Sequence, residues 1–171
     1  DAIVEGVHFD SATSPEQIGH KALARPLSDI AAMGGTPSHA LITLGINTSI
    51  KEDYIEAVYT GLKNCAAQYG VNIVGGETTT LPKFTLSVSL LGKVKNPIMR
   101  SGSKIGDAIF VSGELGGSIA EHHLNFIPRI AESQWLTDSF NIHAMIDLSD
   151  GLASDLRHLL TTHTGAEILA S

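Results

Sequence analysis

The residues best suited to do chemistry in this 171-residue chain are acidic residues that stand beside glycines or other turn-forming residues. They are Asp1, Asp29, Glu77, Asp147 and Asp150, and we expect each to lie at the end of a helix or strand. Glycine lets a backbone approach a phosphate closely, and a neighbouring carboxylate can hold Mg²⁺ at about 2.0–2.1 Å. If these corners converge, they form a site for several metal ions and a phosphate group. Spacing alone leaves a second interpretation open, in which the carboxylates only stabilise helix ends or are solvated.

Composition excludes several function classes. The net charge of −7 argues against a basic nucleic-acid surface, although divalent cations can join carboxylates to a polyanion such as ATP. Cys65 is the only cysteine, which excludes a disulfide framework and favours a reducing cytoplasm. No apolar run reaches the ~18 residues that a membrane span needs. We therefore expect a globular cytoplasmic protein with neither a membrane nor a nucleic-acid partner.

Familiar catalytic motifs are absent from the sequence. A phosphate-binding loop of the GxxxxGK[ST] kind is missing, because Val94 follows Gly92-Lys93. The SxxK pattern at 101–104 lacks the KTG that accompanies it in penicillin-binding enzymes. The histidine pairs His122-His123 and His158/His163 are interpreted as surface residues rather than metal ligands.

Alternating apolar residues predict the strands that must carry these groups. A short apolar strand is predicted to end at the glycine pair that precedes Glu77. The predicted strands cover 1–9, 38–47, 71–74 and 84–90.

Capping boxes at Ser14 and Ser49 predict two helices. The first is expected to end near Arg25, because Pro26 cannot donate a helical hydrogen bond, and a short helix follows over 27–33. The order strand, helix, strand, helix, strand, strand indicates an α+β fold for this half of the chain.

Asn96-Pro97 marks a predicted boundary between domains 1–96 and 97–171. Beyond it the pattern predicts a strand over 107–111, a short strand or turn over 145–148 and a helix from 150 to about 163.

Six segments resemble, in order, the motifs of the thiamine-monophosphate kinase family: DAIVEGVHF, SDIAAMGGTP, IVGGETT, RSGSKIGDAIFVSGELGGS, HLNFIPR and MIDLSDGLASDL. They span nearly the whole chain. SDIAAMG followed by GGE is shared by a superfamily that includes aminoimidazole ribonucleotide synthetase, selenophosphate synthetase and the hydrogenase-maturation dehydratase. VEGVHF and DLSDGL point to the kinase branch.

The resemblance implies a synthetase-like fold of two domains. The N-terminal half would bind metal and nucleotide and would form a dimeric β-barrel with its copy, with helices outside. The C-terminal α/β half would be partial here. The implied reaction is in-line transfer of the γ-phosphoryl group of ATP to thiamine monophosphate, with several Mg²⁺ ions, in a homodimer.

The resemblance also implies a role for each matching residue. Metal ligands would be Asp1, Asp29, Glu77, Asp147 and Asp150, of which Asp29 and Asp147 would matter most for catalysis. The nucleotide would contact Gly76, Glu77, Arg100, Ser149 and Tyr59. The acceptor would contact His8.

Departures from the family pattern leave alternatives open. Glu77 stands where Asp is commoner, and the segment 118–123 is shorter than usual. The start at Asp1 rather than Met indicates a fragment. We expect it to fold and dimerise without turnover, because the partial C-terminal half leaves the implied acceptor pocket without a wall. Other interpretations are another ATP-dependent member of the superfamily or an inactive dimeric homologue. A selenophosphate synthetase needs a reactive cysteine near its N-terminus, and Cys65 is a poor candidate.

Overall fold

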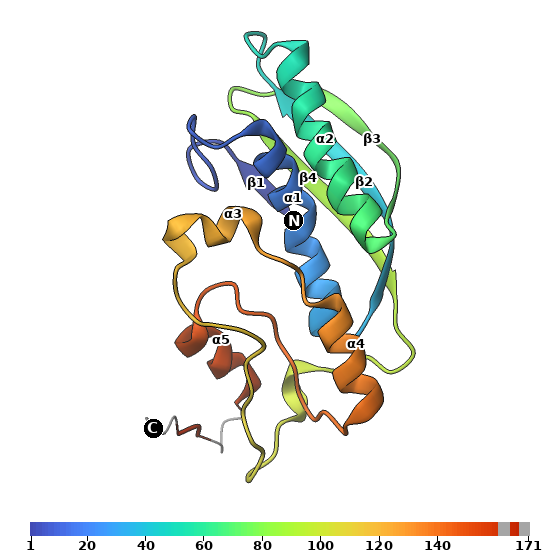
Figure 1. Cartoon of the computed structure of the whole chain (residues 1–171), viewed down its shortest axis with the longest axis vertical. Coiled ribbons are helices and arrows are strands. Elements are labelled where there is room, and N and C mark those ends of the chain that lie inside the picture. The colour runs from blue at the N-terminus through green and yellow to red at the C-terminus, as the bar shows by residue number, and fades with distance from the viewer. Residues whose placement is uncertain (161–164, 168–171) are drawn as a thin grey trace.

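The computed structural model describes residues 1–160 and 165–167, and its strands form one mixed sheet. The strands are β1 Ala2–Val4, β2 Thr36–Ile46, β3 Asn72–Thr80 and β4 Thr85–Lys93. Their order across the sheet is β1-β4-β2-β3 (Figure 1). β4 runs antiparallel to both of its neighbours, whereas β2 and β3 are parallel. The predicted α+β fold is therefore confirmed.

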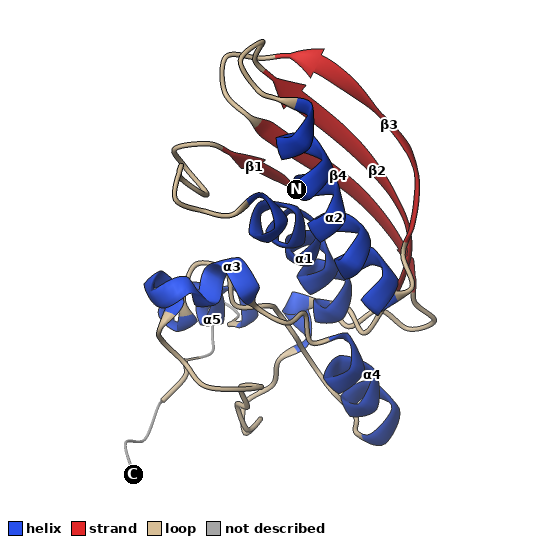
Figure 2. Cartoon of the chain, turned by 45° about the horizontal axis from the view of Figure 1, so that its top comes forward, coloured by secondary structure: helices blue, strands red, loops and turns tan. Residues whose placement is uncertain are grey.

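Two long helices cover one face of this sheet and leave the other face open (Figure 2). They are α1 Pro15–Ala32 and α2 Glu52–Tyr69. The shorter helices are η1 Arg100–Gly102, η2 Ser118–His122, α3 His123–Asn125, α4 Ile130–Ser139 and α5 Leu152–Leu159. α3 and α4 both pack on α1, so the chain beyond β4 returns to the same helix. Of the helices in the described part of the chain, none is long and apolar enough to cross a membrane.

The hydrophobic core lies between the sheet and these two helices. Alternate residues of β2 and β4 point into it, including Ile42, Leu86 and Val88. From α2 it receives Val58 and Leu62, as the helical spacing predicts. The period of two over 38–47 and 84–90 and the apolar face of α2 are thus confirmed.

The two helices approach each other at glycines. A Cβ atom built on Gly19 would lie 2.0 Å from the backbone oxygen of Val58, and one on Gly61 would lie 2.0 Å from that of Glu16. Real Cβ contacts do not come this close, so the two backbones touch because neither position carries a side chain. Glycine costs helix stability, and here close packing compensates for that cost.

The prediction that Pro26 divides the first helix is wrong. α1 is continuous from Pro15 to Ala32, with the predicted capping box at Ser14. Proline inside a helix costs about 3 kcal/mol. Leu23 and Leu27 flank it and are fully buried, and each such burial contributes roughly 1.5–3 kcal/mol. Packing against the sheet therefore outweighs the missing hydrogen bond.

Two other expected boundaries are also wrong. Ser49 does not cap α2, because its backbone N–H and its hydroxyl both donate to the Asn47 side chain, and Lys51 takes the cap position. β3 does not stop at the glycine pair but continues to Thr80, paired with β2. A Cβ on Gly76 would lie 1.8 Å from the Ile42 oxygen, so glycine permits this pairing.

The strand boundaries at the two ends of the chain differ from the prediction too. β1 is only three residues long, and a turn follows it in which Val7 is exposed. The segment 107–111 is not a strand, and Phe110 within it is 89% exposed. A strand needs a neighbour for its backbone N–H groups, and the described chain offers none there. The helix predicted from 150 begins at Leu152, and residues 161–163 of that prediction lie outside the described residues.

Replacing Gly61 by Ala is expected to destabilise the fold despite alanine's higher helix propensity. The added methyl group has to push the backbone of Glu16 away, and such overpacking costs about 1–3 kcal/mol. Thermal or urea unfolding measures the loss. Asn64→Ala, on the exposed side of the same helix, is the control and should be neutral or slightly stabilising. Equal stability of the two variants would contradict the backbone contact.

Candidate acidic site at the end of helix α1

The last turns of α1 bring two of the predicted acidic residues together. Ser28 lies on α1, and its hydroxyl donates to the Asp147 carboxylate at 3.0 Å. These two residues are 119 positions apart in the sequence. Asp29 follows Ser28 directly, so the contact brings Asp147 beside it. Sequence spacing alone could not establish this convergence.

Burial and the charge of Asp147 act on Asp29 in the same direction. Partial burial raises the pKa of Asp29 above its ordinary value, and the neighbouring Asp147 carboxylate raises it further. The positive charges of Arg100 and Arg25 act in the opposite direction. The Asp29 side chain is nevertheless exposed to solvent, so water screens much of this repulsion. Charge of this kind favours binding of a cation.

Asp1 reaches the same region through Arg25. The Arg25 guanidinium donates to the Ala2 carbonyl at 2.9 Å and lies 3.9 Å from the Asp1 carboxylate. Arg25 stands one turn before Asp29 on α1, so it connects the start of β1 to the acidic pair. Arg100, in η1, supplies the other cation near Asp29. Asp1, Asp29, Asp147 and Arg100 therefore occupy one region at this end of α1.

His8 lies in the turn after β1 and is half-buried. Its Nδ1 accepts a hydrogen bond from the Val4 backbone N–H at 3.1 Å. Burial, with the charges of Arg25 and Lys21, lowers the pKa of His8, so the ring is neutral near pH 7 and carries its proton on Nε2. That N–H is a donor suited to a phosphate or another anion.

Lys21 is a residue of this region that sequence reasoning missed. Its Nζ donates to the His8 carbonyl at 2.5 Å and lies 2.8 Å from the Nδ1 of His123. The residue is buried, and burial followed by the charge of Arg25 lowers its pKa. His123 is thus half-buried against α1 rather than a surface histidine, whereas His122 and His158 are exposed as predicted. His163 lies outside the described residues.

Ser149 and Asp150 lie in the exposed loop before α5. Their backbone N–H groups both donate to the carboxylate of Asp155, at 2.9 and 3.0 Å. Asp155 is buried, and the sequence analysis missed it because an Asp within a helix ordinarily faces water. The side chains of this loop are therefore exposed to solvent, while its backbone N–H groups are hydrogen-bonded to the buried Asp155.

Glu77 does not join the cluster within one chain. It lies on β3, in register with Thr43 of β2. Ile42 and Leu44 on either side of Thr43 are buried beneath the helices, so Thr43 and Glu77 face the open side of the sheet. Asp29 lies on α1, on the covered side. The sheet separates the two carboxylates.

Gly76 and Tyr59 also lie away from Asp29. Gly76 pairs with Ile42 inside the sheet, and Tyr59 is half-buried on α2, packed against the hydrophobic core. A pocket of about 590 Å³ opens on Glu5, Phe9, Asp10 and other residues near the N-terminal end of α1. It contains no predicted site residue.

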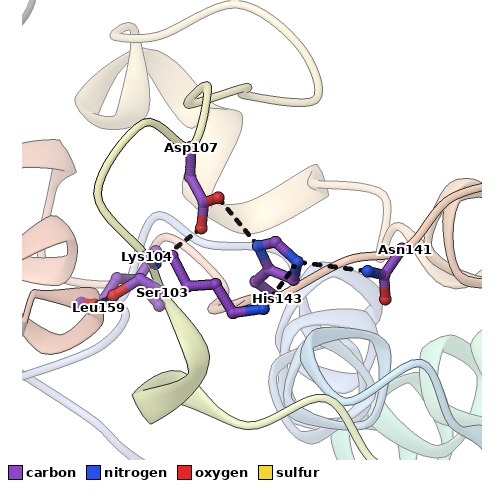
Figure 3. A network of polar contacts seen from close by, with 6 residues as sticks. All are labelled: Ser103, Lys104, Asp107, Asn141, His143 and Leu159. Atoms are coloured by element: carbon purple, nitrogen blue, oxygen red, sulfur yellow. Dashed lines mark hydrogen bonds and ion pairs between the residues drawn. The ribbon is translucent and has the colours of Figure 1, made fainter.

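The coil that leads to Asp147 is fastened by a polar network (Figure 3). Asp107 accepts from the Nδ1 of His143 at 2.8 Å and from the Lys104 backbone N–H at 2.8 Å. The Nε2 of His143 contacts Asn141 at 3.2 Å and the Lys104 ammonium at 3.3 Å. Ser103 donates to the Leu159 carbonyl at the end of α5. These contacts join the segments 103–107 and 141–143 to each other and to the end of α5.

The described residues contain no group of three or more His, Cys, Asp or Glu side chains close enough to hold a metal ion. The pair Asp29 and Asp147 nevertheless fits Mg²⁺, which prefers one or two carboxylates and takes its other ligands from water and phosphate. Repulsion between them, which adds to the effect of burial in raising the pKa of Asp29, would be relieved by such a cation.

Comparison with known proteins identifies the family. Residues 1–94 match the family described as AIR synthase related protein, N-terminal domain. The chain belongs to this family. It is also 43% identical, over 98% of its length, to thiamine-monophosphate kinase of Rhodopirellula baltica, of which it covers 54%. The resemblance to thiamine-monophosphate kinases inferred from the motifs is confirmed.

Solved structures agree. AaThiL complexed with AMPPCP and TMP matches 93% of this chain with a TM-score of 0.88 and 33% identity, and the chain covers 57% of it. Thiamine-monophosphate kinase from Stenotrophomonas maltophilia matches with a TM-score of 0.86 and 33% identity, over 93% of this chain and 58% of that one. The chain thus spans about half the length of the relatives it matches.

The Asp107 network makes stability depend on pH in a defined direction. Hydrogen bonds from the Lys104 N–H and then from His143 lower the pKa of Asp107 below its ordinary 3.8. A lowered pKa stabilises the fold above pH 3.8, and this contribution is lost as pH falls through the lowered value. Asp107→Asn should therefore melt below the wild type at pH 7.

Melting temperatures of both proteins from pH 7 to pH 2.5 measure the effect. The gap should close as the pH falls below the ordinary pKa of Asp107. Asp138→Asn, at an exposed position of α4, is the control and should show no such gap. A difference that stays constant over the whole range would contradict the role of the Asp107 charge.

Proposed function

We propose that this chain is the metal- and nucleotide-binding part of an enzyme that phosphorylates thiamine monophosphate with ATP, giving thiamine diphosphate. The observation that carries the proposal is the meeting of Asp29 and Asp147, held by the Ser28 contact, in a chain similar along 98% of its length to a thiamine-monophosphate kinase. The AaThiL complex with AMPPCP and TMP supports an ATP-like donor and this acceptor.

The chemistry asks for charge neutralisation rather than proton removal. The nucleophile is a phosphate oxygen that is already anionic, and the main obstacle to in-line transfer of the γ-phosphoryl group is repulsion between phosphates. Several bound Mg²⁺ ions would neutralise that charge and orient the phosphates. Asp29, Asp147, Asp150 and Asp1 are the residues of this region that would hold them.

Cationic and hydrogen-bonding residues complete the assignment. Arg100 lies close enough to Asp29 to affect its pKa, and its guanidinium can bind a phosphate of ATP in a bidentate manner. The Nε2–H of neutral His8 is assigned to the acceptor. Ser149 is assigned to the nucleotide because it lies between two of the acidic residues.

A second copy of the chain would have to contribute the metal- and nucleotide-binding roles assigned to Glu77, Gly76 and Tyr59. The open face carries exposed apolar residues at Leu41, Val74 and Leu91, as a buried interface would. Pairing two such faces gives the dimeric barrel implied by the resemblance, and it sets Glu77 at the interface. The site would then use carboxylates from both subunits of a homodimer. The boundary between the dimerising domain and the C-terminal domain is assigned to 96/97.

A selenophosphate synthetase is disfavoured by the state of Cys65. Burial raises the pKa of this thiol to about 12 and its side chain is 1% exposed. A reactive cysteine needs a lowered pKa and access to substrate. An inactive dimeric homologue would bind Mg²⁺ and ATP without turnover, and a kinase assay distinguishes it.

Asp29→Asn is expected to abolish most thiamine diphosphate formation in the complete gene product. The loss should exceed the ~10–100-fold typical of residues that only orient a metal ligand. Initial rates with thiamine monophosphate, and with other phosphorylated acceptors, give the measurement. Asp138→Asn is the control and should retain full activity. A variant at Asp29 with nearly wild-type turnover would refute the assignment.

Mixed dimers test whether Glu77 acts across the interface. Asp29→Asn and Glu77→Gln subunits, each weakly active alone, should regain activity when mixed by co-expression, because one of the two sites in each mixed dimer is intact. Affinity tags of two kinds isolate the mixed species for the rate measurement. Failure to recover activity in a purified mixed dimer would place Glu77 and Asp29 in the same subunit's site, whereas full activity of Glu77→Gln alone would remove Glu77 from it.

A further inference from the structure

Asp155 is a buried carboxylate whose charge the proposed chemistry does not use. It lies on α5 and is 2% exposed. Among the charged residues that the structure describes, only Lys21 is buried with it. Burying an acidic side chain is costly unless its oxygens accept hydrogen bonds. The contacts of Asp155 therefore indicate what the residue does.

One carboxylate oxygen of Asp155 accepts three backbone hydrogen bonds. The donors are the N–H groups of Ser149, Asp150 and Gly151, at 2.9, 3.0 and 3.1 Å. The backbone N–H of Asp155 in turn donates to the Gly151 carbonyl at 3.0 Å. A single carboxylate oxygen therefore connects the loop 149–151 to the first turn of α5 through hydrogen bonds.

This arrangement differs from an ordinary helix cap. A capping side chain precedes the helix and accepts from N–H groups inside its first turn. Asp155 instead lies within the helix and accepts from residues that precede it. Its hydrogen bonds consequently fix the conformation of the loop, more than that of the helix. Ser149 and Asp150 remain exposed while their N–H groups are turned toward Asp155.

We propose that Asp155 is a positioning residue for the acidic site: its carboxylate holds the backbone of 149–151 so that Asp147 and Asp150 are pre-arranged for Mg²⁺. The proposal rests on the proposed function for the identity of the ion. Its physical basis is that three donors bound to one charged acceptor leave the loop little freedom. Asp155 itself is buried behind the loop and would not touch the metal.

The charge of Asp155 has a second consequence for the same loop. Three converging N–H groups at the start of a helix ordinarily make a good anion site. Here the protein's own carboxylate occupies these donors. A phosphate near this loop consequently gains nothing from them directly and depends on a cation held by Asp147 and Asp150.

The test compares Asp155→Ala and Asp155→Asn in the complete gene product, with Asp138→Ala on α4 as the control. Two measurements are made. The first follows Mg²⁺ binding and enzyme activity as the Mg²⁺ concentration is raised, and the second follows hydrogen exchange of the backbone amides of 149–151. Asp155→Ala should raise the half-saturating Mg²⁺ concentration about 10–100-fold, as loss of an orienting partner typically does. Exchange at 149–151 should accelerate, and the KM for thiamine monophosphate should change little.

Asp155→Asn should show a smaller shift in the same direction, because the amide keeps one acceptor oxygen but loses the charge. A lower melting temperature with unchanged Mg²⁺ half-saturation would make Asp155 a purely structural residue and overturn the proposal. If the Ala variant fails to fold, the Asn variant decides by the same criterion. If the wild type does not phosphorylate thiamine monophosphate, the proposed function fails, while Mg²⁺ calorimetry and hydrogen exchange still decide the role of Asp155.

Discussion

The backbone contact between α1 and α2 at Gly19 and Gly61 is the constraint on which the rest of the structure depends. It seats both helices side by side on one face of the sheet, with α1 also against β4 and, further along, against α3 and α4. A helix of this length spans roughly 27 Å. Lys21, Arg25 and Ser28 recur along it at helical spacing, so one stripe of α1 meets the His8 turn, the start of β1 and Asp147 in succession.

The hydrophobic pattern was sufficient to predict the elements whose burial is regular. β2, β4 and the apolar face of α2 repeat at periods of two or 3.6 and match the buried residues. Prediction failed where a tertiary contact outweighed a local preference, as at Pro26 within α1, or where a side chain bonded elsewhere, as at Ser49. It also failed at 107–111, where an apolar run lacks a neighbouring strand in the described chain.

The acidic site was only partly accessible from sequence. Each carboxylate could be singled out by its place beside small or turn-forming residues, but the meeting of Asp29 with Asp147 requires the return of the chain to α1. Asp155 lies within the motif MIDLSDGLASDL, but nothing in its residue type or spacing indicates that its carboxylate turns back toward 149–151. Glu77 shows a further limit, since its motif groups it with the other carboxylates while the strand register turns it to the open face of the sheet, so that it could join them only from a second copy.

The charge of the region explains why these contacts occur together. The carboxylates of Asp29 and Asp147 repel each other. The charges of Arg25 and Arg100 partly offset this repulsion, although neither arginine forms an ion pair with Asp29 or Asp147 among the contacts of the described residues. A proton on Asp29 relieves the repulsion, and a divalent cation relieves it more completely, so the two compete for the same carboxylate. The N–H groups of 149–151 already donate to Asp155, so they do not add positive charge to this site. Under the proposed function, a cation bound by Asp29 and Asp147 would offset their repulsion and would be shared with a phosphate.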